Sequence, residues 1–302
     1  MNKSSQHSIR SADIQCHRRV YNPATASLSA TEGPFLKWVG GKRRLLPQLL
    51  PLLPSGKRLV EPFVGAGSIF LATDFPNYLL ADTNATLINL YRLLQEQPDI
   101  VISRACSYFV QENCNQSAYN ALRSRFNATS ITEDERVVLF VYLNKFAFNG
   151  LYRVNKRGEM NAPFAHHTAV PRFPSSALKS FAQKLERATV LCSDFEKTMQ
   201  QAEAGDVVYC DPPYLELENG RGTFTSYAHN GFAFAEHEKL ASRARDLAAR
   251  GIPVVISNHD SPMTRSLYAG ADLHSLSAYR SIAGKSTSRG SAPELVAVFK
   301  AR

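Results

Sequence analysis

The stretch that most constrains the fold lies at residues 206–214, which read Asp-Val-Val-Tyr-Cys-Asp-Pro-Pro-Tyr. Valine and aromatic residues favour a β-strand, and this run is apolar enough to predict a buried one. Pro212 and Pro213 cannot continue a hydrogen-bonded ladder, so the chain must leave the sheet there. Asp211 and Tyr214 are therefore predicted on a stiff loop at the carboxyl end of a strand, where open α/β sheets bind ligands. Taken alone, the stretch fits an ordinary proline turn equally well.

The overall charge indicates a polyanionic partner. The chain has 302 residues, room for one large domain or two, with 35 Lys and Arg against 26 Asp and Glu, a formal net charge of +9. Such a balance favours nucleic acid as the partner. The five cysteines are scattered, which predicts neither a disulfide framework nor a metal site and favours a reducing, cytoplasmic location. No apolar run approaches the roughly 20 residues of a membrane span.

Residues 1–32 are polar and lack periodicity, which predicts a disordered, dispensable tail. The segment 35–44 that follows combines the only tryptophan, Trp38, with the pair Gly40-Gly41 and four basic residues. Glycines allow a close backbone approach, and the basic side chains indicate an anionic ligand. The alternative is a turn before an amphipathic helix over residues 44–53.

A strand, a glycine turn and a helix are predicted next. Residues 58–61 form a short strand, Gly65 and Gly67 make the turn, and Ser68 is a good capping residue for a helix. This arrangement exposes backbone N–H groups at a helix N-terminus. It is only half of the dinucleotide fingerprint, because the third glycine is missing.

A second predicted strand, residues 78–82, ends in Asp82. From that position a carboxylate can accept hydrogen bonds from ribose hydroxyls. The alternative for Asp82 is a cap for a helix over residues 84–95, a position that Asn84 suits as well. Together with the glycine turn, the strand fits either a nicotinamide oxidoreductase or an S-adenosylmethionine-dependent methyltransferase.

Residues 84–146 have apolar side chains at helical spacing and predict an inserted helical subdomain. Residues 143–164 then interleave aromatic, asparagine and basic side chains, with a predicted hairpin turn at 156–159 between strands 151–155 and 160–164. Basic groups can meet phosphates, Asn and Arg can hydrogen-bond base edges, and an aromatic ring can wedge between bases. An exposed hairpin without such a role is the alternative.

After residue 173 the α/β alternation resumes. We expect a long mobile loop near the site at 215–234 and a basic linker at 280–289. The predicted helices are 176–187, 196–203, 236–250 and 261–269, and the predicted strands are 189–192 and 252–257, with 273–279 and 294–299 as a terminal antiparallel hairpin.

The incomplete glycine fingerprint, the basic insert and the Asp-Pro-Pro-Tyr loop favour a methyltransferase. With these motifs the chain resembles the Dam family of DNA N6-adenine methyltransferases over about residues 33–300. The motifs that carry the resemblance are Phe-Leu-Lys-Trp-x-Gly-Gly-Lys (35–42), Glu-Pro-Phe-Val-Gly-Ala-Gly-Ser (61–68), Ala-Asp-x-Asn (81–84), Asn-Gly-Leu-x-Arg-x-Asn-x-Arg-Gly-Glu (149–159), Val-Val-Tyr-Cys-Asp-Pro-Pro-Tyr (207–214) and Ile-Ser-Asn-His-Asp (256–260).

The resemblance implies an α/β, Rossmann-like methyltransferase fold with a mostly parallel sheet and a terminal antiparallel hairpin. A mainly helical target-recognition subdomain containing a β-hairpin is inserted in it. The expected division is a tail at 1–32, a catalytic domain at 33–85 and 187–302, and the insert at 86–186. The implied cofactor is S-adenosyl-L-methionine, bound by Trp38, Lys42, Phe63, Gly65, Gly67, Asp82, Asp194, Phe195 and Asp211.

The resemblance also implies the chemistry. Asp211 and the Pro212 carbonyl would accept hydrogen bonds from the amine of a target adenine, which makes that nitrogen a better nucleophile. An adenine inside a duplex must first be flipped out, and Tyr214 would stack on it. We expect direct in-line transfer of the methyl group without a covalent enzyme intermediate.

For DNA recognition, the resemblance implies the site GATC and a monomer acting on double-stranded DNA, in a bacterium or a phage. Alternatives are another DNA sequence within a restriction-modification system, an RNA substrate, or a non-catalytic DNA-binding relative. The chain departs from the family with Phe148 in place of a tyrosine and His166-His167 in place of basic residues. The implied contacts are Lys37 and Arg153 on guanine edges, Phe148, Asn149, Leu151 and Pro163 on the other bases, and Lys145 and Asn155 elsewhere on the DNA.

Overall fold

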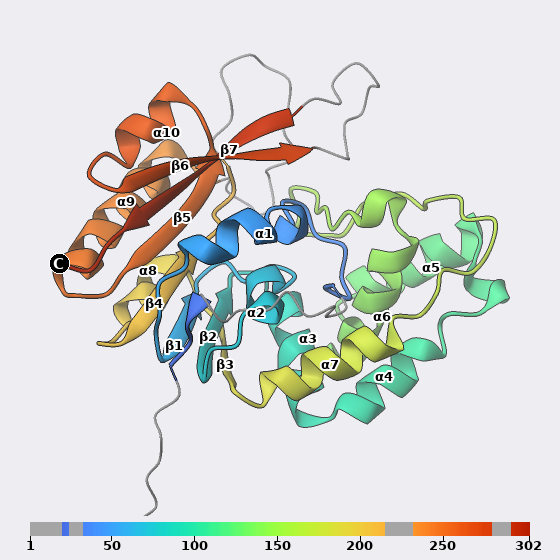
Figure 1. The fold of residues 1–302 in the computed structure, drawn as a ribbon. Helices are drawn as coiled ribbons and strands as arrows, with labels where there is room; N and C mark the ends of the chain where they lie inside the picture. The colour runs from blue at the N-terminus through green and yellow to red at the C-terminus, as the bar shows by residue number, and fades with distance from the viewer. Residues whose placement is uncertain (1–19, 24–32, 215–231, 280–290) are drawn as a thin grey trace, which may run out of the picture.

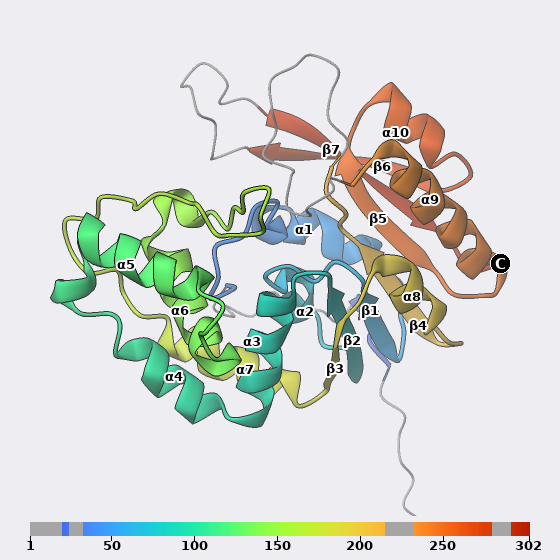
Figure 2. The same ribbon diagram turned by 180° about the vertical axis from the view of Figure 1, so that it is seen from behind.

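A computed structural model describes residues 20–23, 33–214, 232–279 and 291–302. One twisted sheet with helices on both faces lies beside a body of helices (Figures 1 and 2). The strands run in the order β3-β2-β1-β4-β5-β7-β6. Their bounds are β1 Arg58–Glu61, β2 Asn77–Asp82, β3 Ala188–Cys192, β4 Asp206–Cys210, β5 Val254–His259, β6 Asp272–Tyr279 and β7 Ser291–Phe299.

Strands β1 to β5 are parallel, and β7 is antiparallel to both β5 and β6. This confirms the predicted mostly parallel sheet with a terminal antiparallel hairpin. The chain builds outward from β1 to β2 and β3 on one side, and from β4 to β5 on the other. The strand order therefore reverses between β1 and β4, and open α/β sheets bind their ligands at the carboxyl ends of strands at such a point.

Alternate strand residues enter two separate apolar clusters. Leu59 and Val207 pack with side chains of α2 Ser68–Ala72 and of the helical body, whereas Val60 and Val208 pack under α8 and α9. Because β4 and β5 are buried along their whole length, both faces of the central sheet are covered. The helices over the second face are α8 Phe195–Gln200, α9 Phe234–Ala249 and α10 Pro262–Leu267.

The predicted helix over 44–53 is interrupted. The 3₁₀ turn Lys42–Arg44, helix α1 Leu46–Leu49 and the 3₁₀ turn Leu50–Leu52 replace it. Pro47 and Pro51 lie in the first turns of the latter two, because proline fits a helix start and blocks continuation from the preceding turn.

The predicted helical insert is present, and side chains cap its helices where the sequence offers them. Asn84, Asn115 and Thr132 each accept a hydrogen bond from the backbone N–H three residues on. The insert's apolar core is continuous with one face of the sheet. Its bounds at 86–186 as a separate unit thus stay a prediction. The helices are α3 Ala85–Glu96, α4 Pro98–Cys106, α5 Gln116–Asn127, α6 Glu133–Phe146 and α7 Ser175–Leu185.

The predicted hairpin lacks its two strands. Between 151 and 164, the pairing inside the hairpin is one isolated bridge, Val154 with Met160. The turn at 156–159 is present, with the Asn155 N–H donating to the Glu159 carbonyl at 2.9 Å. The expectation of regular strands was wrong because side chains of α5 take backbone groups of the second arm. Asn127 bonds both the N–H and the carbonyl of Met160, and Tyr119 and Arg123 donate to the Ala162 carbonyl.

A short piece of the N-terminal segment is packed. Tyr21 is 4% exposed, its ring stacks on Phe75 at 4.1 Å, and its N–H donates to the Gly56 carbonyl. The expectation of a wholly disordered tail was therefore wrong at Val20–Pro23. The rest of the tail, the predicted linker 280–289 and most of the predicted loop 215–234 lie outside the described residues. Among helices of the described ranges, none has the length and hydropathy of a membrane span.

Candidate active site

Three acidic residues gather at the carboxyl ends of adjacent strands. Glu61 ends β1, Asp82 ends β2, and Asp211 directly follows β4. The strands lie side by side in Figure 1, which places the three groups along one edge of the sheet. The predicted glycine turn follows β1 at this same edge.

Asp211 is held by two donors from distant parts of the chain. Lys42 Nζ and Ser257 Oγ both lie 2.8 Å from Asp211 Oδ1. Lys42 is only 2% exposed, and it also donates to the Gly40 carbonyl at 2.8 Å. Lys42 thereby joins the predicted Gly40-Gly41 segment to the Asp-Pro-Pro-Tyr loop.

Tyr214 is held by one residue of β5 and one of β7. Its hydroxyl donates to Glu294 Oε2 at 2.8 Å, and the His259 ring meets its ring edge-on at 4.5 Å. Lys42 Nζ lies 4.6 Å from the centre of the Tyr214 ring and 4.0 Å from Glu294. Glu294 was not among the predicted site residues, and its one signal in the sequence is an acid at the start of a predicted apolar strand.

The glycine turn needs both of its glycines. Gly65 and Gly67 have φ of 47° and 71°, the left-handed region that favours glycine. A Cβ on Gly65 would come within 3.0 Å of the Trp38 ring, and one on Gly67 within 2.9 Å of the Phe181 ring. Gly67 occupies the N-cap position of α2 without a side-chain cap. The expected cap at Ser68 was therefore wrong: Ser68 is the first helical residue.

Asp82, at the end of β2, accepts a hydrogen bond from the backbone of the glycine turn. Its Oδ2 accepts from the Gly65 N–H at 3.1 Å and its Oδ1 from the Asn84 N–H at 3.0 Å. Burial raises the pKa of Asp82, while these N–H donors act in the opposite direction. Asn84, not Asp82, caps α3.

Tyr91 holds the other side of the turn, since its buried hydroxyl donates to the Gly65 carbonyl. Tyr91 was not among the predicted site residues, because its place in a run of apolar side chains at helical spacing gives no sign of this polar contact.

Glu61 is a buried acid beneath the site. It is 2% exposed, and burial, then the charge of Asp211, raises its pKa to about 8, against smaller opposing effects of Lys184 and the Phe70 N–H. Within the described residues, Glu61 Oε1 has no hydrogen-bond partner. The carboxyl is therefore largely protonated at neutral pH and adds little negative charge to the edge of the sheet.

An aromatic cluster lies beside the turn on the α8 side. The Phe63, Phe195 and Phe232 rings have centroids 5.5 to 5.7 Å apart. Asp194 caps α8, accepting from the Lys197 N–H at 2.9 Å and pairing with its ammonium at 3.1 Å. That N–H, followed by the ion pair, lowers the pKa of Asp194. The structure thus gives Asp194 a role in the helix and brings Phe63 and Phe195 together.

The first of the residues predicted to contact DNA, Lys37, is next to Trp38, which packs on the glycine turn. The Lys37 side chain lies against Gly150, where an added Cβ would come within 2.4 Å of it. Burial, together with the nearby charge of Lys37, lowers the pKa of Lys145 to about 8. Phe148 is 50% exposed, and its N–H donates to the Pro163 carbonyl at 2.8 Å. Four of the predicted residues, Lys37, Lys145, Phe148 and Pro163, therefore belong to one surface.

Asn149 has a φ of 54°, which turns the chain between exposed Phe148 and half-buried Leu151. Arg153 is exposed, with its guanidinium donating to the side chain and the carbonyl of Asn161 at 2.7 and 3.1 Å. Asn155 uses its amide inside the hairpin turn, donating to Glu159 Oε2 at 2.7 Å.

The two histidines differ in their surroundings. His166 is exposed with a φ of 52°, and its ring meets Phe164 edge-on; a ring nitrogen of His167 lies 3.2 Å from the Lys145 carbonyl, and its ring packs on Phe146 and Phe164. His167 therefore takes part in the internal packing of the insert.

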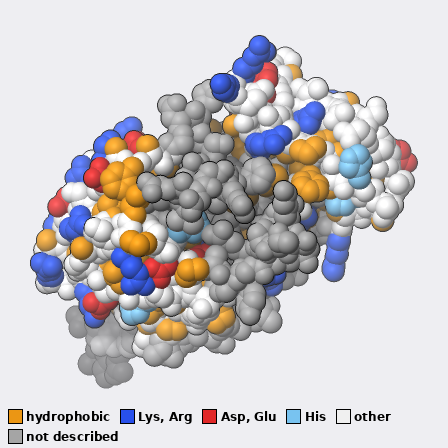
Figure 3. All heavy atoms as spheres, turned by 90° about the horizontal axis from the view of Figure 1, so that it is seen from above, with side chains coloured by type: hydrophobic (Ala, Val, Ile, Leu, Met, Phe, Trp, Pro, Cys, Tyr) orange, Lys and Arg blue, Asp and Glu red, His pale blue; other side chains and the backbone are white. Residues whose placement is uncertain are grey.

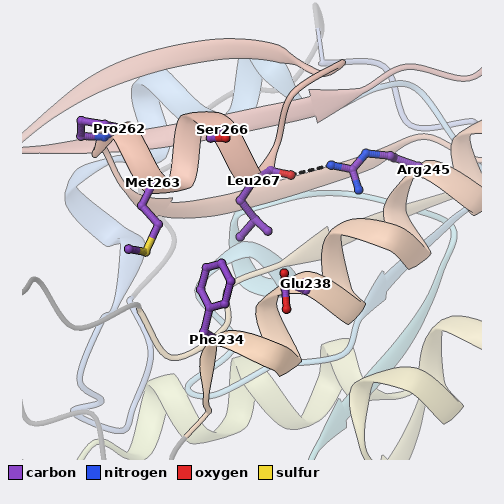
Figure 4. A pocket seen from close by; sticks show the side chains of 7 residues that line it. All are labelled: Phe234, Glu238, Arg245, Pro262, Met263, Ser266 and Leu267. Atoms are coloured by element: carbon purple, nitrogen blue, oxygen red, sulfur yellow. Dashed lines mark hydrogen bonds between the residues drawn. The ribbon is translucent and has the colours of Figure 1, made fainter.

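A cavity of about 550 Å³ lies between α9 and α10, away from these groups (Figure 4). None of the predicted site residues lines it. Its lining side chains are Phe234, Glu238, Arg245, Pro262, Met263, Ser266 and Leu267.

The model of the D12 class N6 adenine-specific DNA methyltransferase family matches residues 38–282 of this chain. The chain belongs to this family. It is 46% identical over 266 residues to the DNA adenine methylase of Vibrio cholerae, covering 88% of this chain and 95% of that protein. It is 43% identical over 266 residues to the DNA adenine methylase of Escherichia coli K12, with the same coverage, and 43% identical over 267 residues to that of Serratia marcescens, covering 98% of that protein.

Proposed function

We propose that this D12 class methyltransferase uses S-adenosyl-L-methionine to methylate the N6 amine of a flipped-out adenine in double-stranded DNA, within GATC. The observation that carries the proposal is the tie between Lys42 and Asp211. It ties the Asp-Pro-Pro-Tyr loop to the segment whose Trp38 packs on the glycine turn, and Asp82 bonds that turn, so that a cofactor and a target base could share one edge of the sheet. The name DNA adenine methylase, borne by the relatives, supports the same substrate.

The residues at this edge fit the proposed cofactor. The left-handed glycine turn packs its backbone directly against the Trp38 ring, and Asp82 keeps lone pairs for ribose hydroxyls in addition to its two backbone bonds. Phe63 and Phe195 supply apolar ring surface for the adenine of the cofactor. When bound, S-adenosylmethionine supplies an electrophilic methyl group on a positively charged sulfur.

Asp211 and the Pro212 carbonyl would accept hydrogen bonds from the amine of the target adenine. These contacts favour a pyramidal nitrogen, which returns its lone pair for attack on the methyl carbon. In the transfer that these residues would support, the amine would gain the methyl carbon while the sulfur keeps the C–S bonding pair, and the amine would then lose one proton to solvent. Positive charge at the nitrogen grows only in the transition state, so a fixed carboxylate lowers the barrier. Lys42 and Ser257 provide the fixation on Oδ1 of Asp211.

Tyr214 would stack on the flipped adenine. Its hydroxyl bond to Glu294 and its contact with His259 limit rotation of the ring, which favours a preformed platform. Exposed Phe148 would fill the space in the duplex that the adenine leaves, because a phenyl ring can wedge between bases without a hydroxyl.

Lys37 and Arg153 would contact the guanines of GATC. The net charge of +9 suits a polyanionic duplex, and Figure 3 shows Lys and Arg side chains, with some acidic ones among them, on the described parts of this face. Asn149, Leu151 and Pro163 would meet the remaining bases, with Lys145 and Asn155 supporting the contact. We propose a monomeric enzyme that works on DNA in the bacterial cytoplasm.

The test expresses the chain in a bacterial host that lacks adenine methylation and maps modified adenines by long-read sequencing. We expect N6-methyladenine at GATC with the wild-type chain and none with Asp211→Ala. Methylation at another sequence would show that the recognition site is not GATC, and it would leave the proposed methyl transfer to adenine unchanged. Normal turnover by Asp211→Ala would refute the role of the carboxylate, and transfer of labelled methyl to RNA alone would refute the substrate.

A further inference from the structure

The buried side-chain amide of Asn144 joins two segments: residues 37–42, proposed to bind the cofactor, and residues 148–150, proposed to contact DNA bases. Asn144 lies in the last turn of α6 and is 1% exposed. Its Oδ1 accepts from the Lys37 N–H at 2.9 Å, and its Nδ2 donates to the Lys37 carbonyl at 2.8 Å. The side chain thus pairs with Lys37 as a neighbouring strand would.

The second N–H of the same amide donates to the Gly150 carbonyl at 3.1 Å. Gly150 has a φ of 66°, and an added Cβ would lie 2.4 Å from Lys37 Cβ, so the Gly150 backbone packs directly against the Lys37 side chain. Both amide protons and the amide oxygen are therefore engaged, and the side chain has little freedom to move.

The segments that Asn144 joins have different proposed tasks. Trp38, next to Lys37, covers the glycine turn, and Lys42 binds Asp211. Phe148 and Asn149, next to Gly150, belong to the proposed base contacts. A displacement at the cofactor site would shift Lys37. Asn144 would transmit this shift to the turn at residues 148–150, because its amide is hydrogen-bonded to both Lys37 and Gly150.

We propose that Asn144 is a positioning residue that couples cofactor binding to recognition of the DNA sequence. It touches neither ligand. The coupling makes each ligand strengthen the binding of the other by the same factor, as linkage requires. The inference rests on the proposed function, because it takes the two ligands to be an adenosyl cofactor and a GATC duplex.

The chain offers a matched control. Asn127 makes the same two-bond pairing with Met160, at 2.9 Å for each bond, and supports the recognition hairpin without touching Lys37. Asn144→Asp and Asn127→Asp are both isosteric and both turn a donor into an acceptor facing a carbonyl. Only the first breaks the link between the segments.

Gly150→Ala and Gly158→Ala form a second pair. Both glycines have positive φ, 66° and 79°, so alanine strains both. The added methyl group collides with Lys37 at position 150, whereas nothing lies within 4 Å of it at position 158. Any difference in coupling between the two variants therefore measures the effect of the collision with Lys37 alone.

The experiment measures binding of S-adenosylhomocysteine with and without a short GATC duplex, and with a duplex of altered sequence, using fluorescence of the single tryptophan, Trp38, and calorimetry. We expect the cognate duplex to tighten binding in the wild type by a factor of about 5 to 150. Asn144→Asp and Gly150→Ala should bring this factor close to one, while Asn127→Asp and Gly158→Ala keep it, all four with cooperative unfolding.

Three results would overturn the inference: wild-type ligands that bind independently, an Asn144→Asp variant with full coupling, or equal losses in the control variants. If Asn144→Asp does not unfold cooperatively, the comparison of Gly150→Ala with Gly158→Ala tests the inference instead. A wild-type protein that does not bind S-adenosylhomocysteine at all would instead refute the proposed cofactor.

Discussion

Lys42 Nζ lies 2.8 Å from Asp211 Oδ1, a contact between residues 169 positions apart that is almost closed to solvent on the lysine side. It ties the segment before the first strand to the loop after the fourth. The same ammonium faces the Tyr214 ring and approaches Glu294. One buried cation therefore organises the proposed adenine site.

Lys42→Met should destabilise the protein by about 3 kcal/mol, because it leaves Asp211 without its charged partner. Asp211→Asn in the same chain should restore part of the loss, since the amide needs no counter-charge. Urea unfolding of the two single variants and the double variant measures this coupling. Lys57→Met, at an exposed position, is the control, and strictly additive losses would show that the pair contributes little.

Glu61→Gln should change the pH dependence of stability. The raised pKa, about 8, means that the folded protein binds a proton that the unfolded chain releases near pH 4.5, so wild-type stability falls as pH rises between these values. Glutamine cannot ionise and avoids this loss. The variant should match the wild type near pH 5 and exceed it near pH 8.5.

The free energy of unfolding in urea, measured at several pH values, tests the Glu61 prediction. Glu96→Gln, at an exposed position in the last turn of α3, serves as control. A wild type whose advantage over Glu61→Gln grows with pH would contradict a protonated Glu61.

Tyr91→Phe removes the hydroxyl that bonds the Gly65 carbonyl. We expect a loss of about 1 kcal/mol in stability and, because the glycine turn loosens, weaker binding of S-adenosylhomocysteine by roughly fivefold. Tyr142→Phe loses a comparable bond, to the Asn113 carbonyl at 2.7 Å, far from the turn. It should lose similar stability and keep its cofactor affinity, and equal effects on affinity would disprove the role of Tyr91.

Arg153→Ala should cost about 1–3 kcal/mol of discrimination at one guanine of the site. Methylation rates on duplexes with single base changes measure this loss, with Arg157→Ala in the exposed hairpin turn as the control. If rates fall equally on all duplexes, Arg153 contacts only the DNA backbone.

Several features of the fold followed from local sequence. Valines and prolines at 206–214 set a buried strand and its end, and the structure confirms both at β4 and the loop after it. Asn84 and Thr132 cap helices as their side-chain chemistry predicts. These outcomes depend on neighbours within a few residues, so the sequence displays them directly.

The errors have a common cause. The two predicted hairpin strands do not form because Asn127, Tyr119 and Arg123, which are distant in sequence, hydrogen-bond backbone carbonyls of the second arm. Tyr21 is ordered because Phe75 and Gly56 happen to lie beside it in space. Neither outcome is visible in the periodicity or composition of the segment itself.

The sequence by itself determined which residues stand at the ends of strands or in the segments that directly follow them: Gly65, Gly67, Asp82 and Asp211. Tertiary structure alone decided which distant groups meet them. It paired Lys42 with Asp211, Glu294 with Tyr214, and Asn144 with Lys37, and it made Glu61 a buried acid with a raised pKa. Such pairs depend on how the sheet and the insert pack, because burial and long-range contacts arise only when elements separated by many residues are brought together.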